Sequence, residues 1–206
     1  MFTKDGVRGD LEKQVSGGKS PGYVIDVDSL DATFGEALPP LRTDPLESEI
    51  VPRSRQKLDA SSAKLLGELM HATAAGLGVS KFVYSELPIL WVVDEAGELW
   101  FAVEEVVKAE TGEFVFPRFR NTSIEREAQQ RLGHPALIGG GSGRIGGEII
   151  FDVASEEPGW FITNGSGRYG LRDGRTRSHL NSVKSRFEVF GIDLRTQFYA
   201  PGGAGV

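Results

Sequence analysis

Two titratable side chains, His134 and Glu148, stand in a glycine-rich stretch where acid–base chemistry is readily placed. His134 precedes Pro135 on an expected loop, and an imidazole can accept or donate a proton near neutral pH. Glu148 follows two glycines and precedes Ile-Ile-Phe, so its carboxylate enters an apolar strand, where burial would raise its pKa. We predict His134 and Glu148 as catalytic residues. Glu148 at the start of a strand equally well faces water, and the sequence does not establish that the two side chains meet.

A second glycine-rich loop, NGSGRYG at residues 164–170, follows the next apolar run. Its alternating glycines leave backbone amides accessible, and the Ser166 hydroxyl and the Arg168 guanidinium can donate to an oxyanion or a phosphate. The residues that we predict to bind an anionic substrate are Arg144, Ser166, Arg168, Tyr169 and Arg172. The alternative is a tight turn in which Tyr169 lies in the core and Arg168 caps a helix end.

Residues 141–146 match the pattern GxGxxG, which lets backbone amides approach a phosphate. In dinucleotide-binding folds the third glycine opens a helix, whereas here GEIIF continues as a strand. We therefore expect a turn or a closely approached backbone at this place. The chain has no cysteine, no HExxH and no GxSxG, so the sequence predicts no metal site and no serine-hydrolase elbow, and it indicates no particular cofactor.

The elements that must position these residues follow from hydrophobic periodicity and from capping and turn residues. Three helices are predicted, at residues 59–77, 122–132 and 176–190. Paired apolar runs predict three hairpins, at 87–93 with 98–103, at 106–108 with 113–116, and at 147–153 with 160–163, and a short strand through 198–199. This order predicts an α+β fold, in which an antiparallel or mixed sheet built from hairpins has about three helices packed against it.

Residues 1–55 differ in composition from the rest, because glycines and prolines are scattered among charges and apolar clusters are short. We expect an extended or partly disordered N-terminal arm over 1–55, with a strand at about 23–27 that could join a sheet edge. Residues 56–206 suit a single α+β domain. No apolar run reaches the roughly 18 residues of a membrane span, and no signal-peptide centre is present, which predicts a cytoplasmic protein or one secreted by a leaderless route.

The net charge of −6 is unevenly distributed. Residues 1–133 carry 15 basic and 22 acidic side chains, while residues 134–206 carry 8 and 7. Between residues 168 and 186, six basic side chains surround the single acid Asp173, which predicts either an anion site or a solvated helix flank. Binding of nucleic acid is not favoured, because the isoelectric point is near 5.2 and basic and aromatic residues do not alternate.

Four segments, VVDEAGELWFA, GHPALIGG…GRIGGEIIFD, ITNGSGRYG and FGIDL, occur in this order along the chain. Over about residues 90–195 the arrangement resembles an uncharacterised module of bacterial polymorphic-toxin and effector-type proteins, which has a histidine-led start, a strand with AGE and a turn of the form NxSGHY. The chain departs from that module at Gly146, where alanine is usual, and at Arg168, where histidine is usual. The resemblance implies a setting in bacterial antagonism or host manipulation, and no particular reaction.

Two functions agree with these features. The first is a bacterial effector or toxin-type domain that binds an anionic substrate between the glycine-rich loops, with His134 and Glu148 in acid–base roles. The second is a non-catalytic immunity or adaptor protein that binds a basic protein partner through its acidic half. The expected partner is a protein, such as a cognate toxin, an immunity protein or a host target, and the sequence leaves open whether the chain is an enzyme. The first function requires His134, Glu148, Ser166 and Arg168 to converge on one pocket.

Overall fold

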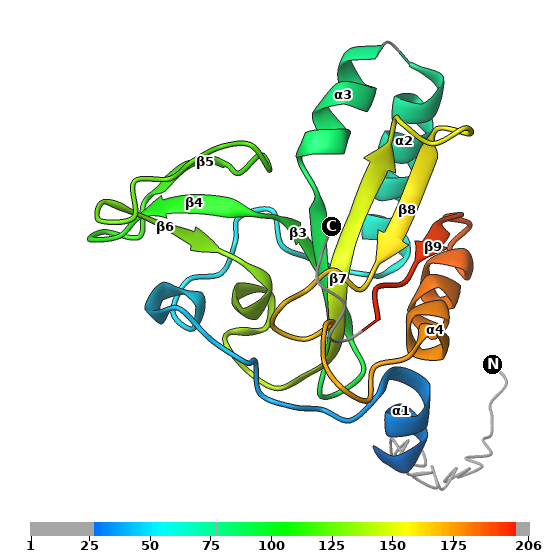
Figure 1. Cartoon of the computed structure of the whole chain (residues 1–206), viewed down its shortest axis with the longest axis horizontal. Coiled ribbons are helices and arrows are strands. Elements are labelled where there is room, and N and C mark those ends of the chain that lie inside the picture. The colour runs from blue at the N-terminus through cyan, green and yellow to red at the C-terminus, as the bar shows by residue number, and fades with distance from the viewer. Residues whose placement is uncertain (1–26, 77, 201–206) are drawn as a thin grey trace, which may run out of the picture.

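The computed structural model describes residues 27–76 and 78–200. A mixed six-stranded sheet in the order β1–β3–β2–β7–β8–β9 forms its centre, and an antiparallel three-stranded sheet in the order β5–β4–β6 projects from its side (Figure 1). Neighbouring strands are antiparallel except for β8 and β9. This arrangement confirms the predicted α+β class with a mixed sheet.

The described residues form nine strands, four α-helices and two 3-10 helices. The strands are β1 (Gln56–Lys57), β2 (Ile89–Asp94), β3 (Leu99–Val103), β4 (Glu105–Lys108), β5 (Phe114–Pro117), β6 (Gln129–Leu132), β7 (Gly143–Asp152), β8 (Gly159–Thr163) and β9 (Arg195–Gln197). The helices are α1 (Val27–Phe34), α2 (Ala60–Ala75), α3 (Gly78–Glu86) and α4 (Arg177–Glu188), with the 3-10 helices η1 (Pro45–Glu47) and η2 (His134–Ile138). None of these helices is long and apolar enough to cross a membrane.

The six-stranded sheet is covered on both faces, as the alternation of side chains along β2 shows. The odd-numbered residues 89, 91 and 93 belong to the main core, to which α1, α2 and α4 contribute apolar side chains. The even-numbered Leu90 and Val92 lie on the opposite face and pack with Leu137 of η2 and with Tyr169. The polar residues of the candidate site lie on this second face, which η2 and the loop after β8 cover.

The two sheets meet at Glu104, which alone separates β3 from β4. The small sheet has its own apolar cluster, in which Val107 and Leu132 pack with Ala136 and with the partly buried Leu46 and Ile50. The chain therefore runs from the central sheet into the small sheet without a linker, and polar side chains of both sheets lie close to this junction.

The helix predicted at 122–132 is wrong, because residues 129–132 form strand β6. In β6, Leu132 pairs with Glu105 and Gln130 pairs with Val107, so that β4 has a partner on both edges. A helix over 122–132 would offer only a single apolar row, Ile124, Ala128 and Leu132, which is too little to bury. Pairing with β4 satisfies the backbone instead, and it depends on a contact that local sequence does not show.

Most of the other predicted elements are present with shifted ends. Helix α2 begins after Asp59, whose carboxylate accepts hydrogen bonds from the backbone N–H groups of Ser61 and Ser62, and it ends before Gly76 rather than at residue 77. Helix α3 was not predicted, although Val79, Phe82 and Val83 recur in it at helical spacing, and none of its residues is buried. Residues 198–199, where a short strand was predicted, are not in a strand and lie directly after β9 at 195–197, which pairs with β8.

Residues 27–55 lie along the edge of the domain. Helix α1 occupies the first eight of them and packs Phe34 into the main core, although the composition of this segment indicated extended backbone. The strand expected at about 23–27 falls largely outside the described residues, and Val27 begins α1. The division into an arm at 1–55 and a domain at 56–206 stays a prediction.

Candidate functional site

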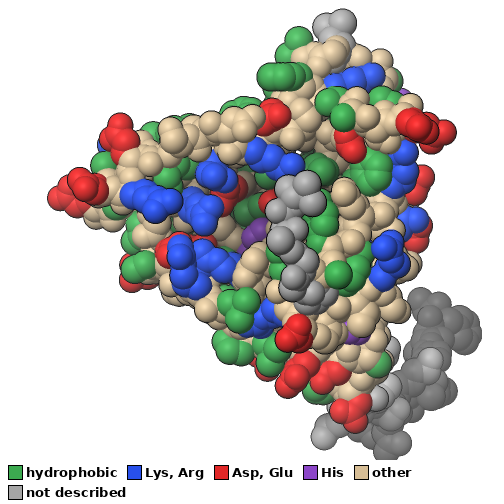
Figure 2. Space-filling view, viewed as in Figure 1, with side chains coloured by type: hydrophobic (Ala, Val, Ile, Leu, Met, Phe, Trp, Pro, Cys, Tyr) green, Lys and Arg blue, Asp and Glu red, His purple; other side chains and the backbone are tan. Residues whose placement is uncertain are grey.

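A cavity of about 210 Å³ lies at the junction of the two sheets. We call it the His134 cavity. Figure 2 shows a hollow on this face in which a histidine side chain is visible, with Lys and Arg side chains gathered beside it. The charged and titratable residues that line the cavity are Glu47, Glu104, Arg118, Arg131, His134, Glu148 and Arg168. Three residues that the sequence predicted for one pocket, His134, Glu148 and Arg168, therefore do converge.

His134 is the first residue of η2, where Gly133 precedes it and Pro135 stiffens the turn. Its Nε2 lies 2.9 Å from the carbonyl oxygen of Gly147. A carbonyl only accepts, so Nε2 carries the hydrogen and Nδ1 holds a lone pair in the neutral ring. Only 8% of His134 is exposed, and burial lowers its pKa to about 4, which outweighs the opposing effect of the Gly147 bond and of the Glu104 charge. His134 is neutral at pH 7.

Glu148 lies on β7 opposite Leu90 of β2, so its side chain lies on the second face of the sheet. Its Oε2 accepts a hydrogen bond of 2.5 Å from Nη2 of Arg120, and 22% of the side chain is exposed. No hydrogen bond joins Glu148 to His134 among the described residues. The group that orients the imidazole is the carbonyl of the preceding residue, Gly147, rather than the Glu148 carboxylate.

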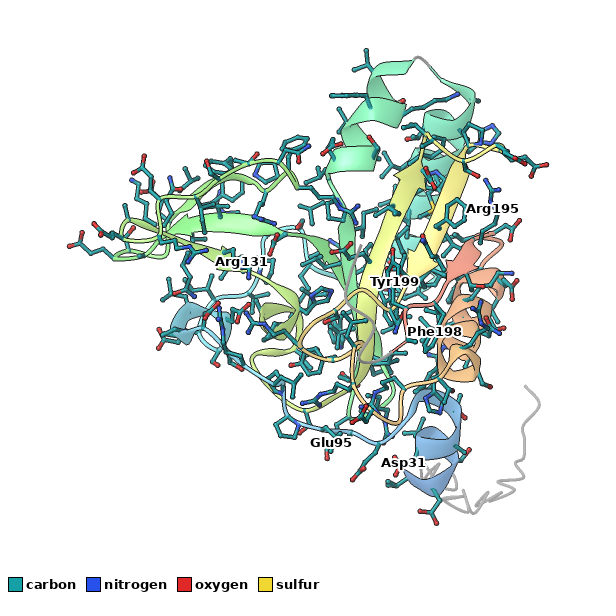
Figure 3. The ribbon with its side chains drawn as sticks, viewed as in Figure 1. Asp31, Glu95, Arg131, Arg195, Phe198 and Tyr199 are labelled. Atoms are coloured by element: carbon teal, nitrogen blue, oxygen red, sulfur yellow. The ribbon has the colours of Figure 1, made fainter. Side chains whose placement is uncertain are left out.

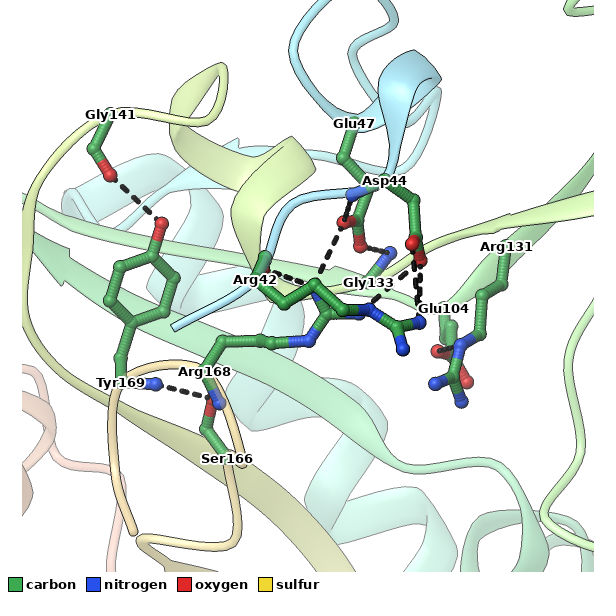
Figure 4. A network of polar contacts seen from close by, with 10 residues as sticks. All are labelled: Arg42, Asp44, Glu47, Glu104, Arg131, Gly133, Gly141, Ser166, Arg168 and Tyr169. Atoms are coloured by element: carbon green, nitrogen blue, oxygen red, sulfur yellow. Dashed lines mark hydrogen bonds and ion pairs between the residues drawn. The ribbon is translucent and has the colours of Figure 1, made fainter. Parts of the chain in front are cut away.

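Arg168 connects the loop after β8 with the segment around η1 (Figure 4). Its guanidinium lies 3.3 Å from Asp44 and 3.3 Å from Glu47, and it also donates to the carbonyl of Arg42. Burial raises the pKa of Glu47, although backbone N–H groups and the Arg168 charge oppose it. Burial acts to raise the pKa of Asp44 as well, but hydrogen bonds from Arg42 and Arg168 outweigh it and lower that pKa. The charge of Arg168 is thus largely compensated within the protein.

Ser166 and Tyr169 do not line the His134 cavity. The Ser166 Oγ accepts from the backbone N–H groups of Arg168 and Tyr169, at 3.3 and 3.2 Å, and so closes the turn (Figure 4). The Tyr169 hydroxyl donates to the Gly141 carbonyl at 2.8 Å, and burial raises the pKa of Tyr169 far above its usual range. These two side chains form the tight turn, with the tyrosine in the core, that the sequence left as the alternative.

Arg144 and Arg172 also lie away from the His134 cavity, and with Arg168 and Arg175 they hold residues 31–47 against the domain. Arg144 is 1% exposed and binds the Asp31 carboxylate and the Gly35 carbonyl. It also donates to the carbonyl of Glu95, so that Asp31 and Glu95 lie at one edge of the molecule (Figure 3). Arg172 and Arg175 donate to backbone carbonyls, those of Pro39 at 2.6 Å and Glu36 at 2.7 Å.

Replacing Ser166 by alanine is expected to lower the free energy of unfolding by about 1 kcal/mol, because the backbone N–H groups of Arg168 and Tyr169 lose their acceptor, the buried Ser166 hydroxyl. Urea unfolding of the two proteins measures the difference. Ser178→Ala, at an exposed position on α4, is the matched control and should change stability by less than about 0.5 kcal/mol. Equal stability of both variants would show that the Ser166 hydroxyl does not hold the turn.

Arg118, directly after β5, and Arg131 of β6 were not predicted as site residues. Arg118 Nη1 lies 2.6 Å from Glu104 Oε2, and Arg131 Nε lies 4.0 Å from Glu104 Oε1. A local signal was present, since residues 118–131 carry four arginines and two glutamates, but the surplus of acids over residues 1–133 concealed it. The helix expected at 122–132 would also have placed Arg131 elsewhere.

The described residues contain no group of three or more His, Asp or Glu side chains that could hold a metal ion. Comparison of the chain with protein families, with curated proteins and with solved structures gave no match.

Proposed function

We propose that the protein is an effector-type domain that binds a small polar substrate in the His134 cavity, with His134 as the proton acceptor. The convergence of His134, Glu148 and Arg168 carries this proposal, because these titratable and charged side chains come from three separate segments and line one cavity. Their cavity lies between two sheets, which is a rigid setting for a ligand. The bacterial effector setting comes from the sequence resemblance alone.

His134 is suited to accept a proton through Nδ1. Nε2 is committed to the Gly147 carbonyl, so the ring has a defined tautomer and orientation. Nδ1 makes no hydrogen bond within the described residues, and a substrate hydroxyl or a water molecule can donate to it. A base with a pKa of about 4 is weak, but a bound anion near the ring would raise that pKa toward neutrality.

The carboxylates of the cavity would support the charged ring. Glu104 acts to raise the pKa of His134, so an imidazolium formed during a reaction would be stabilised by its charge. Glu148, which is bonded to Arg120, is placed to contact a substrate directly or through water. Arg168 serves mainly to hold Asp44 and Glu47, and thereby the wall of the cavity.

Growth of a bacterial host that produces the protein tests this proposal. The wild-type chain is expected to slow growth, and His134→Gln or Glu148→Gln is expected to remove most of that effect, because each variant keeps the size of the side chain but removes the titratable group. His71→Gln, at an exposed histidine on α2, is the control and should behave as wild type. Thermal unfolding of each purified variant confirms that it folds.

Undiminished toxicity of both cavity variants would contradict the catalytic roles. A harmless wild-type chain that protects the host against the toxin encoded beside its gene would contradict the proposal as well. That second result would support the immunity or adaptor function, in which the acidic half binds a basic protein.

A further inference from the structure

A second, larger cavity of about 540 Å³ adjoins the His134 cavity. We call it the arginine cavity, because Arg42, Arg118, Arg126 and Arg131 line it, together with Gln130 and a single carboxylate, that of Asp44. Two of these arginines, Arg118 and Arg131, also line the His134 cavity. We propose that the arginine cavity binds the phosphate group of a small phosphate-bearing molecule.

Several hydrogen-bond donors of the arginine cavity have no acceptor among the described residues. Within residues 27–76 and 78–200, Arg126 has no hydrogen bond and no ion pair. The side-chain nitrogens Arg118 Nε and Gln130 Nε2 are buried and lack a partner as well. Buried donors without an acceptor are costly, and an anion bound here would supply acceptor oxygens for them.

The charge of the arginine cavity points in the same direction. Four arginines and one aspartate line the cavity in a protein whose net charge is −6. That carboxylate, Asp44, is already bonded to Arg42 and Arg168. Glu104, on the side of the His134 cavity, binds Arg118 and lies 4.0 Å from Arg131, so Arg126 has no countercharge among the described residues. A local excess of positive charge against the net charge of the chain favours an anionic ligand.

Phosphate fits this set of donors better than a carboxylate does. A phosphate oxygen pair accepts bidentate bonds from a guanidinium, and its remaining oxygens can accept from further arginines and from an amide. The volume of the arginine cavity exceeds that of a phosphate ion alone and lies in the range typical of small-molecule sites. The ligand therefore has a further chemical group, or body, attached to its phosphate. The extension of this body past Arg118 and Arg131 into the His134 cavity is the one part that rests on the proposed function.

Titration of the whole protein with pyrophosphate at low ionic strength, followed by calorimetry, tests the proposal. Saturable binding to the wild type is expected, and Arg126→Ala should weaken it at least about tenfold through loss of a charged double donor. Arg126→Lys keeps the positive charge but loses the paired N–H donors of the guanidinium, and should weaken binding less than Arg126→Ala does. Arg126 is exposed and unpaired among the described residues, so neither variant should disturb folding.

Arg177→Ala is the matched control, because it removes one positive charge from the exposed start of α4. Equal weakening by Arg177→Ala and Arg126→Ala would overturn the proposal and indicate attraction by net charge only. No binding by the wild type would overturn it too. Binding of a single-stranded RNA, but not of pyrophosphate, through Arg126 would overturn it in favour of nucleic acid. The titration measures binding and does not depend on any effect on growth. Failure of the arginine-cavity proposal can therefore be distinguished from failure of the proposed function.

Discussion

Replacing Gly147 by alanine is expected to destabilise the protein by about 3 kcal/mol or more. A Cβ atom at this position would lie 1.8 Å from the carbonyl oxygen of Thr163 and 2.8 Å from the Trp91 ring. The first of these atoms belongs to the backbone of β8, which cannot move aside without breaking its pairing with β7. Urea unfolding at neutral pH measures the loss. Because the Gly147 carbonyl holds His134, we also expect the variant to lose any function of the His134 cavity.

The matched control for this prediction is Gly167→Ala. Gly167 lines the same cavity, and a Cβ atom there would meet nothing within 4 Å. Its free energy of unfolding should stay within about 0.5 kcal/mol of the wild type. If Gly147→Ala were as stable as Gly167→Ala, this result would contradict the close contact between Gly147 of β7 and the Thr163 carbonyl of β8.

Lowering the pH from 7 to 4 is expected to cost the wild-type protein about 3 kcal/mol more than it costs the His134→Gln variant. The ordinary pKa of 6.5 applies to His134 in the unfolded chain, and burial lowers the pKa to about 4 in the folded protein. Between these two values the unfolded chain binds a proton that the folded protein does not bind. Stability therefore rises with pH through this window, and it is lost as the pH falls from 6.5 to 4.

Unfolding in urea at several values between pH 4 and pH 7 measures this difference. Glutamine suits the comparison because its amide can donate to the Gly147 carbonyl without titrating. Burial also lowers the pKa of His179, but this residue is present in both proteins, so its contribution cancels. Parallel stability profiles of wild type and variant would contradict the buried, neutral state of His134.

The central part of the fold could be predicted from local sequence. The apolar runs at 87–93 and 147–153 form strands, with Gly97 providing the positive φ of the β2–β3 turn. Helix α4 was likewise predicted from its apolar stripe of Leu180, Val183 and Phe187, all of which are buried. These predictions are confirmed because hydrophobic periodicity and turn residues are properties of neighbouring positions in the sequence.

By itself, then, the sequence determined the α+β class and the choice of His134, Glu148 and Arg168 as candidate site residues. The tertiary structure decided that these three residues share a cavity. Only the tertiary structure decided that residues 129–132 pair with β4, that four arginines hold residues 31–47, and that Arg118 and Arg131 turn toward the site. The reason is physical. A strand edge, a buried countercharge or a shared cavity depends on groups far apart along the chain, and the energy of such contacts overrides local preference.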